Sequence, residues 1–185
     1  MSERSELTRA FICIEMPDEV VKEIARVQEE AGKKRFDGKM TELENLHLTL
    51  KFLGEIDKKK IEEVREKLAG IKFDEIECAL GEIGVFSHRG NPRLVWVKVN
   101  GKGIFELQKK IDLELKGMFE LEERFMSHLT IARVKYVKDK KGFVDYIKGI
   151  GVKKIKFKVG KFYLKRSELK SPGPIYSDLA EFVVN

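Results

Sequence analysis

Two short segments of the chain, His47-Leu48-Thr49-Leu50 and His128-Leu129-Thr130-Ile131, are near copies of each other. The sequence holds only three histidines, and two of them stand two positions before a threonine in these tetrads. Histidine has an ordinary pKa of about 6.5, which suits proton transfer near neutral pH. The repetition therefore predicts a two-histidine acid/base site, whereas the alternative is a pair of unrelated core histidines.

Both tetrads have the period-2 pattern of a β-strand with one buried face, in which residues i and i+2 point the same way. The leucines and Ile131 would face the core, and each histidine would share the opposite face with its threonine. Each tetrad would thus present one imidazole and one hydroxyl, side by side, from a rigid support.

The elements that must position the tetrads can be placed from apolar periodicity and helix-start residues. We expect helices over 18–32, 58–69 (with Asp57 as N-cap), 102–117 and 140–149, separated by a loop at 33–45 and by strands. The expected strands cover 8–15, 46–53, 74–86, 94–99, 126–133, 153–166 and 176–184.

The order strand, helix, His strand, helix, strand occurs twice in this arrangement. We therefore predict an α+β fold, a single domain over 1–185 with two lobes of roughly 1–90 and 91–185. Each lobe would be an antiparallel sheet with helices on its outer side. A pseudo-twofold axis would bring the two His strands face to face across a central cleft.

Composition and charge set limits on the function class. The chain has 37 Lys and Arg against 31 Asp and Glu, a formal net charge of +6, which suits an anionic partner. An excess of Lys and Glu with few amides is typical of thermophile surfaces. No apolar run reaches the roughly 20 residues of a membrane span, and Met1-Ser2-Glu3-Arg4 lacks a signal-peptide core, so we expect a cytoplasmic monomer with no membrane contact. Cys13 and Cys78 stand singly and predict buried free thiols.

The tetrads in their context resemble the 2H phosphoesterase superfamily. The longer segments Thr8-Arg9-Ala10-Phe11-Ile12, His47 to Gly54, His128 to Arg133, and Ser167-Glu168-Leu169 with Gly173-Pro174-Ile175-Tyr176 resemble one branch, the bacterial and archaeal RNA 2′,3′-cyclic phosphodiesterases, long called 2′-5′ RNA ligases. The resemblance covers nearly the whole chain. It implies the two-lobed fold and RNA substrates with 2′,3′-cyclic phosphate ends, tRNA fragments among them.

The chemistry of opening a cyclic phosphate requires a base for the attacking water, an acid for the leaving oxygen and donors for the phosphoryl oxygens. One histidine from each lobe and the hydroxyls of Thr49 and Thr130 supply these groups, so no metal and no cofactor is expected. The resemblance implies that His47 is the proton donor and His128 the acceptor, which releases O3′ and leaves a 2′-phosphomonoester. From the sequence alone the two roles are interchangeable. With a 5′-hydroxyl in place of water, the same groups can form a 2′-5′ bond between RNA ends.

The two halves differ five positions after the histidines, where Phe52 corresponds to Arg133. In the family this arginine contacts the phosphate. An uninterrupted strand would point Arg133 away from His128, so a bulge or the end of the strand near Ala132 must turn it; otherwise it is a structural ion-pair partner. Phe11 is a second substrate-binding candidate, by stacking on a base, with a place in the core as the alternative.

Two basic features are less specific. Lys154, Lys156 and Lys158 alternate with apolar residues, which suits either RNA backbone binding or protection of a sheet edge. Arg89 and Arg93 lie within an expected surface loop, Ser87 to Arg93, and are further candidates for holding RNA.

Two other functions fit the same sequence. One is a phosphodiesterase for a small cyclic nucleotide, and the other is an RNA-end-binding module with little turnover. The intact His and Thr pairs speak against the binding module, because binding alone needs cations more than it needs neutral acid/base groups.

Overall fold

The computed structural model describes residues 7–171 and 173–184. Residues 1–4, which entered the expectation about a signal peptide, lie outside the described part of the chain. None of the helices in that part combines the length and apolar character that a membrane span requires.

The described residues form the predicted α+β fold, in which nine strands make one sheet with antiparallel pairing throughout. The strands are β1 (Thr8–Glu15), β2 (Asp37–Met40), β3 (His47–Ile56), β4 (Ile76–His88), β5 (Asn91–Asn100), β6 (His128–Tyr136), β7 (Lys156–Val159), β8 (Lys161–Leu169) and β9 (Pro174–Val183). The helices are α1 (Asp18–Gly32), α2 (Lys58–Ala69), α3 (Lys102–Glu114) and α4 (Lys140–Lys148), with a short 3₁₀ turn at Leu43–Asn45.

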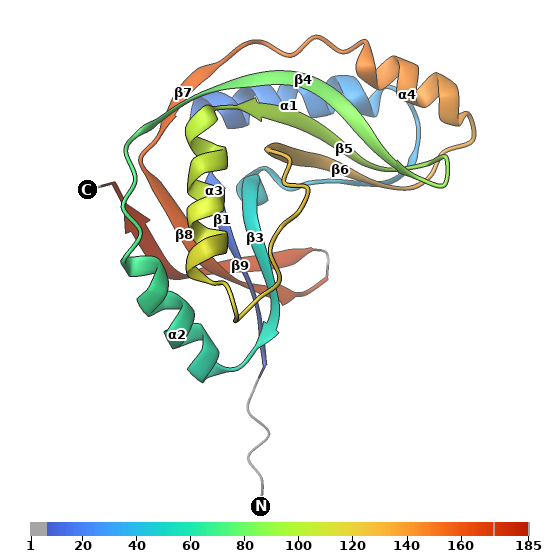
Figure 1. The fold of residues 1–185 in the computed structure, drawn as a ribbon. Coiled ribbons are helices and arrows are strands. Elements are labelled where there is room, and N and C mark those ends of the chain that lie inside the picture. Colours follow the sequence, from blue (N-terminus) through green and yellow to red (C-terminus); the bar gives the residue numbers. More distant parts are fainter. Residues whose placement is uncertain (1–6, 172, 185) are drawn as a thin grey trace, which may run out of the picture.

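The strand order is β7-β4-β5-β6-β3-β1-β8-β9, with β2 paired to β6. We call β7, β4, β5, β6 and β2 the β6 wing, and β3, β1, β8 and β9 the β3 wing. Within the described residues, one pair of the strand ladder, Leu48 with Leu129, joins the wings. Figure 1 shows the sheet strongly bent, with the β6 wing above the β3 wing. The two His strands thus meet at the bend.

The helices cover the outer side of the bent sheet (Figure 1). Helix α4 packs on β4 and β5, α1 on β6, and α3 on β3 and β4. Val20, Ile24 and Val27, which share one face of α1 at helical spacing, are completely buried. The apolar core fills the space between the sheet and the helices, which leaves the concave side of the sheet open for a site.

The wings do not coincide with the halves of the chain. The boundary expected near residue 90 falls in the turn between β4 and β5, which are paired neighbours in the β6 wing. The β3 wing contains β1 and β3 from the first half but β8 and β9 from the second half. Each wing therefore draws strands from both halves, and the two halves share one core.

Two local expectations differ from the structure. The expected loop 33–45 contains β2, whose residues Asp-Gly-Lys-Met carry no alternating apolar pattern and are extended because they pair with β6. A Cβ on Gly38 would lie 2.2 Å from the carbonyl oxygen of Arg133, so this close pairing needs glycine. The expected strand 153–166 is divided at Gly160 into β7 and β8, which lie far apart in the strand order.

Candidate active site

A cavity of about 670 Å³ lies where the two His strands meet. Its lining includes all six residues singled out in the sequence: Phe11, His47, Thr49, His128, Thr130 and Arg133. The remaining lining residues come from β1, β2, β3, β4, β5, β8, β9 and the 3₁₀ turn with its flanking residues. Segments far apart in the chain therefore converge on the two tetrads.

The Leu48–Leu129 pair explains why the tetrads face the same cavity. Both leucines are completely buried on the outer side of the sheet, so the residues on either side of them project toward the concave side. Around an antiparallel pair the flanking residues cross over, which places His47 toward Thr130 and His128 toward Thr49. The imidazoles thus take diagonal positions with a hydroxyl beside each.

The same irregularity follows both tetrads. In β3 the register against β1 skips Leu50, and in β6 the register against β5 skips Ile131, the residue three positions after each histidine. Both strands then show two consecutive buried residues followed by an exposed one, in the pattern iBiBBeB, where i, B and e mean intermediate, buried and exposed. Such bulges reverse the parity of a strand. They return Phe52 and Arg133 to the cavity side. An uninterrupted strand would point Arg133 away from His128, and the bulge at Ile131 is the break that turns it back.

The two imidazoles are oriented in the same way. His47 Nδ1 lies 2.7 Å from the carbonyl oxygen of Asn45, and His128 Nδ1 lies 2.7 Å from that of Met126. A carbonyl oxygen only accepts, so Nδ1 is the protonated nitrogen in both rings. Nε2 is therefore the atom at which each histidine gains or loses a proton.

Aromatic rings hold the imidazoles from the side. The rings of Phe11 and Tyr176 have their centroids 4.9 Å and 5.3 Å from that of His47, and Phe86 lies 5.3 Å from His128. Cys13 and Cys78 are both free and buried, as expected. Phe11 is only 4% exposed and packs with Cys13. This burial favours the core alternative for Phe11 and a contact with His47 over stacking on a base.

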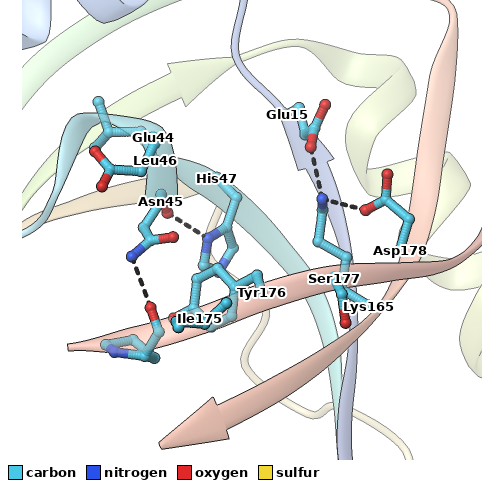
Figure 2. Close-up of a pocket in the computed structure, with 11 residues that line it drawn as sticks. Glu15, Glu44, Asn45, Leu46, His47, Lys165, Ile175, Tyr176, Ser177 and Asp178 are labelled. Carbon is cyan, nitrogen blue, oxygen red and sulfur yellow. Dashed lines mark hydrogen bonds and ion pairs between the residues drawn. The ribbon is translucent and has the colours of Figure 1, made fainter. Parts of the chain in front are cut away.

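A second cavity of about 400 Å³ lies on the other side of His47 and Tyr176, which line both cavities. Figure 2 shows how this side is fastened: the Asn45 carbonyl accepts from the imidazole, and Asn45 Nδ2 donates to the carbonyl of Pro174 at 3.0 Å. The Lys165 ammonium lies 2.6 Å from Glu15 and also pairs with Asp178. His47 is thus held by a short polar network that connects β3 with β9.

The environment lowers the pKa of His47 from its ordinary value. Burial is the largest cause, because it penalises the charged imidazolium, and the positive charges of Lys165 and Arg133 act in the same direction. The hydrogen bond to the Asn45 carbonyl opposes these effects. In the free protein, His47 therefore favours its neutral form more than an exposed histidine would.

The cavity is electropositive. Among the described residues, its lining has three cationic side chains, Arg9, Lys39 and Arg133, and one carboxylate, Glu42, which pairs with Lys39. Both arginines are exposed, and neither forms an ion pair with any described residue. Two uncompensated guanidinium groups beside two imidazoles suit a phosphate-bearing ligand.

Other basic candidates lie away from this cavity. Lys156 and Lys158 are on β7, the last strand at one end of the sheet, and Lys158 pairs with Glu75 at 2.6 Å. Their position supports the edge-protection alternative. Neither they nor Lys154, Arg89 and Arg93 line the cavity.

Several cavity residues had no role assigned from the sequence. Lys39 stands on the unpredicted β2, and Tyr176 reaches His47 from the last strand. Arg9, Phe52 and Tyr176 belong to the segments that carried the family resemblance, and Phe52 also stands at the position that corresponds to Arg133 in the other half. Within the described residues, no group of three or more His, Cys, Asp or Glu side chains could hold a metal ion.

Comparison with known families and proteins gives a consistent result. The family model "LigT like Phosphoesterase" matches the chain twice, over residues 14–96 and 97–176. The two matches correspond to the internal repeat that the paired tetrads indicate.

The chain is also similar to individual proteins along most of its length. It is 36% identical to the RNA 2′,3′-cyclic phosphodiesterase of Thermotoga maritima, covering 94% of both chains. It is 35% identical to the protein of the same name from Methanocaldococcus jannaschii, covering 94% of this chain and 99% of that one. A solved structure from Thermus thermophilus superposes with a TM-score of 0.80 at 24% identity, over 95% and 97% of the two chains, and so shares the fold.

Proposed function

This chain belongs to the LigT-like phosphoesterase family, and from that premise we propose that it hydrolyses RNA 2′,3′-cyclic phosphate ends to 2′-phosphomonoesters. The observation that carries the proposal is the pair of imidazoles in one electropositive cavity, each with Nδ1 held by a backbone carbonyl and Nε2 left for proton transfer. The names of the two relatives support the choice of substrate.

In the proposed reaction, Nε2 of His128 takes a proton from a water molecule as its oxygen attacks phosphorus. The P–O3′ bond breaks as Nε2–H of His47 gives its proton to O3′. The product carries a 2′-phosphate and a 3′-hydroxyl, and one proton has passed from His47 to the product while His128 has gained one. Attack and departure lie roughly in line through phosphorus, which suits two imidazoles on opposite sides of it.

The donor role of His47 requires its imidazolium form, although its pKa in the free protein is lowered. The substrate itself offsets this, because the negative charge of a bound cyclic phosphate favours a cationic neighbour. His47 would therefore become an effective acid mainly when the cavity is occupied. Thr49, Thr130 and Arg133 would bind the non-bridging oxygens and stabilise the charge that develops on them.

The proposed mechanism uses only side chains of the protein and needs no metal ion. With a 5′-hydroxyl in place of the attacking water, the same transfers join two RNA ends through a 2′-5′ bond. The proposal also includes RNA, tRNA fragments among them, as the natural partner of a cytoplasmic monomer. Buried free thiols are in keeping with a reducing compartment.

Product analysis tests the proposal directly. An oligonucleotide ending in a 2′,3′-cyclic phosphate is incubated with the protein, with and without excess chelator, and the terminal phosphate is located by ³¹P NMR. We expect a 2′-phosphate at nearly equal rates under both conditions. A 3′-phosphate product would contradict the roles of the two histidines, and loss of turnover in chelator with recovery on adding a divalent cation would contradict metal independence. Tight binding without turnover would favour the RNA-end-binding module.

A further inference from the structure

The chain contains only two glutamines, and both lie on the buried faces of the helices that precede the tetrads. Gln28 on α1 is 8% exposed, and Gln108 on α3 is 5% exposed. Each directly follows a buried apolar residue and stands four positions after a buried isoleucine, so the two positions correspond in the internal repeat. A buried amide costs free energy unless its hydrogen-bonding groups are satisfied. What each amide binds therefore indicates its role.

The amide of Gln28 joins two separate segments of the sheet. Its Nε2 donates to the carbonyl oxygen of Ile131 at 2.8 Å and to that of Thr41 at 2.7 Å. The Thr41 amide in turn donates to the Ile131 carbonyl at 2.9 Å. An amide nitrogen has two protons to donate, and both are used here. We call this unit of Gln28, Thr41 and Ile131 the amide clamp; it links α1, the end of β2 and β6.

The clamp lies where the ladder of β6 is interrupted on both sides. Ile131 is the residue that the register between β5 and β6 skips. On the other side of β6, Leu129 pairs with β3, whereas pairing with β2 begins at Ala132. Between these pairings, the Ile131 carbonyl accepts from Thr41 and from Gln28. The side chain of Gln28 therefore fastens the bulge of β6.

This bulge decides where the guanidinium of Arg133 lies. Arg133 stands two positions after Ile131 and pairs with Lys39 of β2. Gln28 holds both strands at this point, β6 through Ile131 and β2 through Thr41. A guanidinium binds phosphate through directed, bidentate hydrogen bonds, so a small displacement of its strand weakens that contact.

Gln108 forms no equivalent clamp. Its Nε2 is buried and has no hydrogen-bond partner among the described residues. The bulge of β3 is fastened instead by Lys51, which pairs with Asp112 and donates to the Glu120 carbonyl. The two repeats thus support their bulges by different means, and the amide clamp is on the strand that carries Arg133.

We propose that Gln28 is a positioning residue for Arg133. By holding the bulge of β6 from the outer side of the sheet, it keeps the guanidinium where it can bind a phosphate between the two imidazoles. Gln28 does not touch the substrate, because it is buried and does not line the cavity. The inference rests on the proposed function, which assigns the phosphate to Arg133.

A double-mutant cycle separates positioning from general support of the fold. The value of kcat/KM for the cyclic-phosphate oligonucleotide is measured in the unmodified protein, Gln28→Met, Arg133→Met and the double variant. We expect Gln28→Met alone to lower kcat/KM about tenfold, because it weakens a charge-assisted contact made by Arg133. In the Arg133→Met background the same replacement should lower it less than about twofold, since the group that Gln28 positions is gone.

Inorganic phosphate provides a second readout that does not depend on turnover. Titration followed by ³¹P NMR should show about tenfold weaker binding in Gln28→Met, and no further loss when this change is added to Arg133→Met. Gln28→Asn, whose amide is one methylene shorter, should show a smaller loss with the same dependence on Arg133. This milder variant tests the proposal if Gln28→Met does not fold.

Two controls address the residue types. Gln108→Met removes a buried amide from the equivalent position of α3, and its effect on kcat/KM should be the same with and without Arg133→Met. Arg65→Met, which removes a cation from the exposed side of α2, should leave the effect of Gln28→Met unchanged.

The outcomes separate the positioning role from the proposed function. Equal losses from Gln28→Met in both backgrounds, or unchanged phosphate affinity in this variant, would overturn the positioning role while hydrolysis stands. If phosphate binding depended on Gln28 and Arg133 as expected, but the unmodified protein did not hydrolyse the oligonucleotide, the proposed function would fail and the positioning of Arg133 for phosphate would stand.

Discussion

Each imidazole of the proposed pair is oriented by a neutral backbone carbonyl. A carbonyl partner fixes the ring and the tautomer, as a carboxylate does in other sites, but it adds no formal negative charge. Burial and the cations Lys165 and Arg133 then lower the pKa of His47, and the hydrogen bond to the Asn45 carbonyl opposes them only in part. At the scale of single residues, the proposed mechanism makes the phosphate of the substrate the anion that completes the site.

Replacing either His47 or His128 by Ala should reduce turnover of the cyclic-phosphate oligonucleotide by about 10²–10⁴-fold, because each removes one proton-transfer partner. The double variant should be little worse than either single variant, since acid and base act in one step. Binding of the same RNA should change far less, and Arg133→Ala should weaken it more than either histidine replacement. Undiminished turnover in a single histidine variant would contradict the assignment.

Arg133→Met should raise the pKa of His47, because it removes a positive charge that lowers this pKa. His47 would then stay protonated to higher pH, and the alkaline limb of the kcat/KM profile should move to higher pH even though the maximum falls. The His47 ring signals in an NMR titration give the same quantity without substrate. Arg65→Met is the control and should not move the alkaline limb of the kcat/KM profile. A shift of this limb to lower pH in Arg133→Met would contradict the role of His47 as the acid.

At the scale of elements, the bulge at Leu50 has an effect on each side of β3. It exposes Phe52 to the cavity and turns Lys51 into the interior, where Lys51 pairs with Asp112 of α3 and donates to the carbonyl of Glu120 at 2.7 Å. The Glu122 amide also donates to Asp112 at 2.7 Å. This network fastens the segment that leads to His128, so the two His strands are coupled outside the cavity.

Lys51→Met should destabilise the protein by about 3–5 kcal/mol, because it leaves the carboxylate of Asp112 buried without its cation. The double variant Lys51→Met, Asp112→Leu should recover much of this loss, since neither charge remains. Guanidinium denaturation near neutral pH measures the free energy of unfolding of both variants. Lys141→Met, at an exposed pair with Asp145, is the matched control and should cost less than about 1 kcal/mol.

The pH dependence of the same pair provides a second check. Burial raises the pKa of Asp112, but the hydrogen bonds from Lys51 and the Glu122 amide outweigh it, and the net shift is downward. A lowered carboxyl pKa contributes stability that is present above the unfolded value of about 3.9 and is lost as the pH falls through the folded value. The difference between the parent and Lys51→Met should therefore shrink in acid. A difference that stayed constant would contradict this role.

At the scale of the whole molecule, only a part of the net charge of +6 comes from side chains that face the cavity. Many surface lysines are paired with acids, as Lys33, Lys59 and Lys161 are, and these pairs are screened and contribute little to binding. The two unpaired arginines of the cavity are the cations that a bound RNA would neutralise. The salt dependence of binding should therefore be modest.

For the His128→Ala variant, which permits binding to be measured without turnover, the logarithm of the association constant should fall with the logarithm of salt concentration. The slope should be near about −1.4, at about −0.7 for each of two phosphate contacts on a single strand. Adding Arg133→Met should make the slope less negative by about 0.7, and adding Arg65→Met should leave the slope unchanged. A much steeper slope would show that surface lysines outside the cavity hold the RNA.

The sequence by itself determined which residues share a face. The period-2 pattern places His47 with Thr49 and His128 with Thr130, because alternation along a strand is a local property. The repetition indicated two equivalent strands and one site between them, and the apolar spacing located the four helices. It also showed that Arg133 needed a break in the alternation to reach the cavity.

Tertiary structure decided what depends on residues distant in the chain. The bulges at Leu50 and Ile131 arise from pairing with β1 and β5, and β2 is a strand because β6 lies beside it. Phe11 and Phe52 are both aromatic residues in strand segments, yet packing against His47 buries the first, and the bulge leaves the second exposed. Local periodicity is set by backbone geometry alone, whereas register, burial and charge pairing follow from long-range contacts that no short segment encodes.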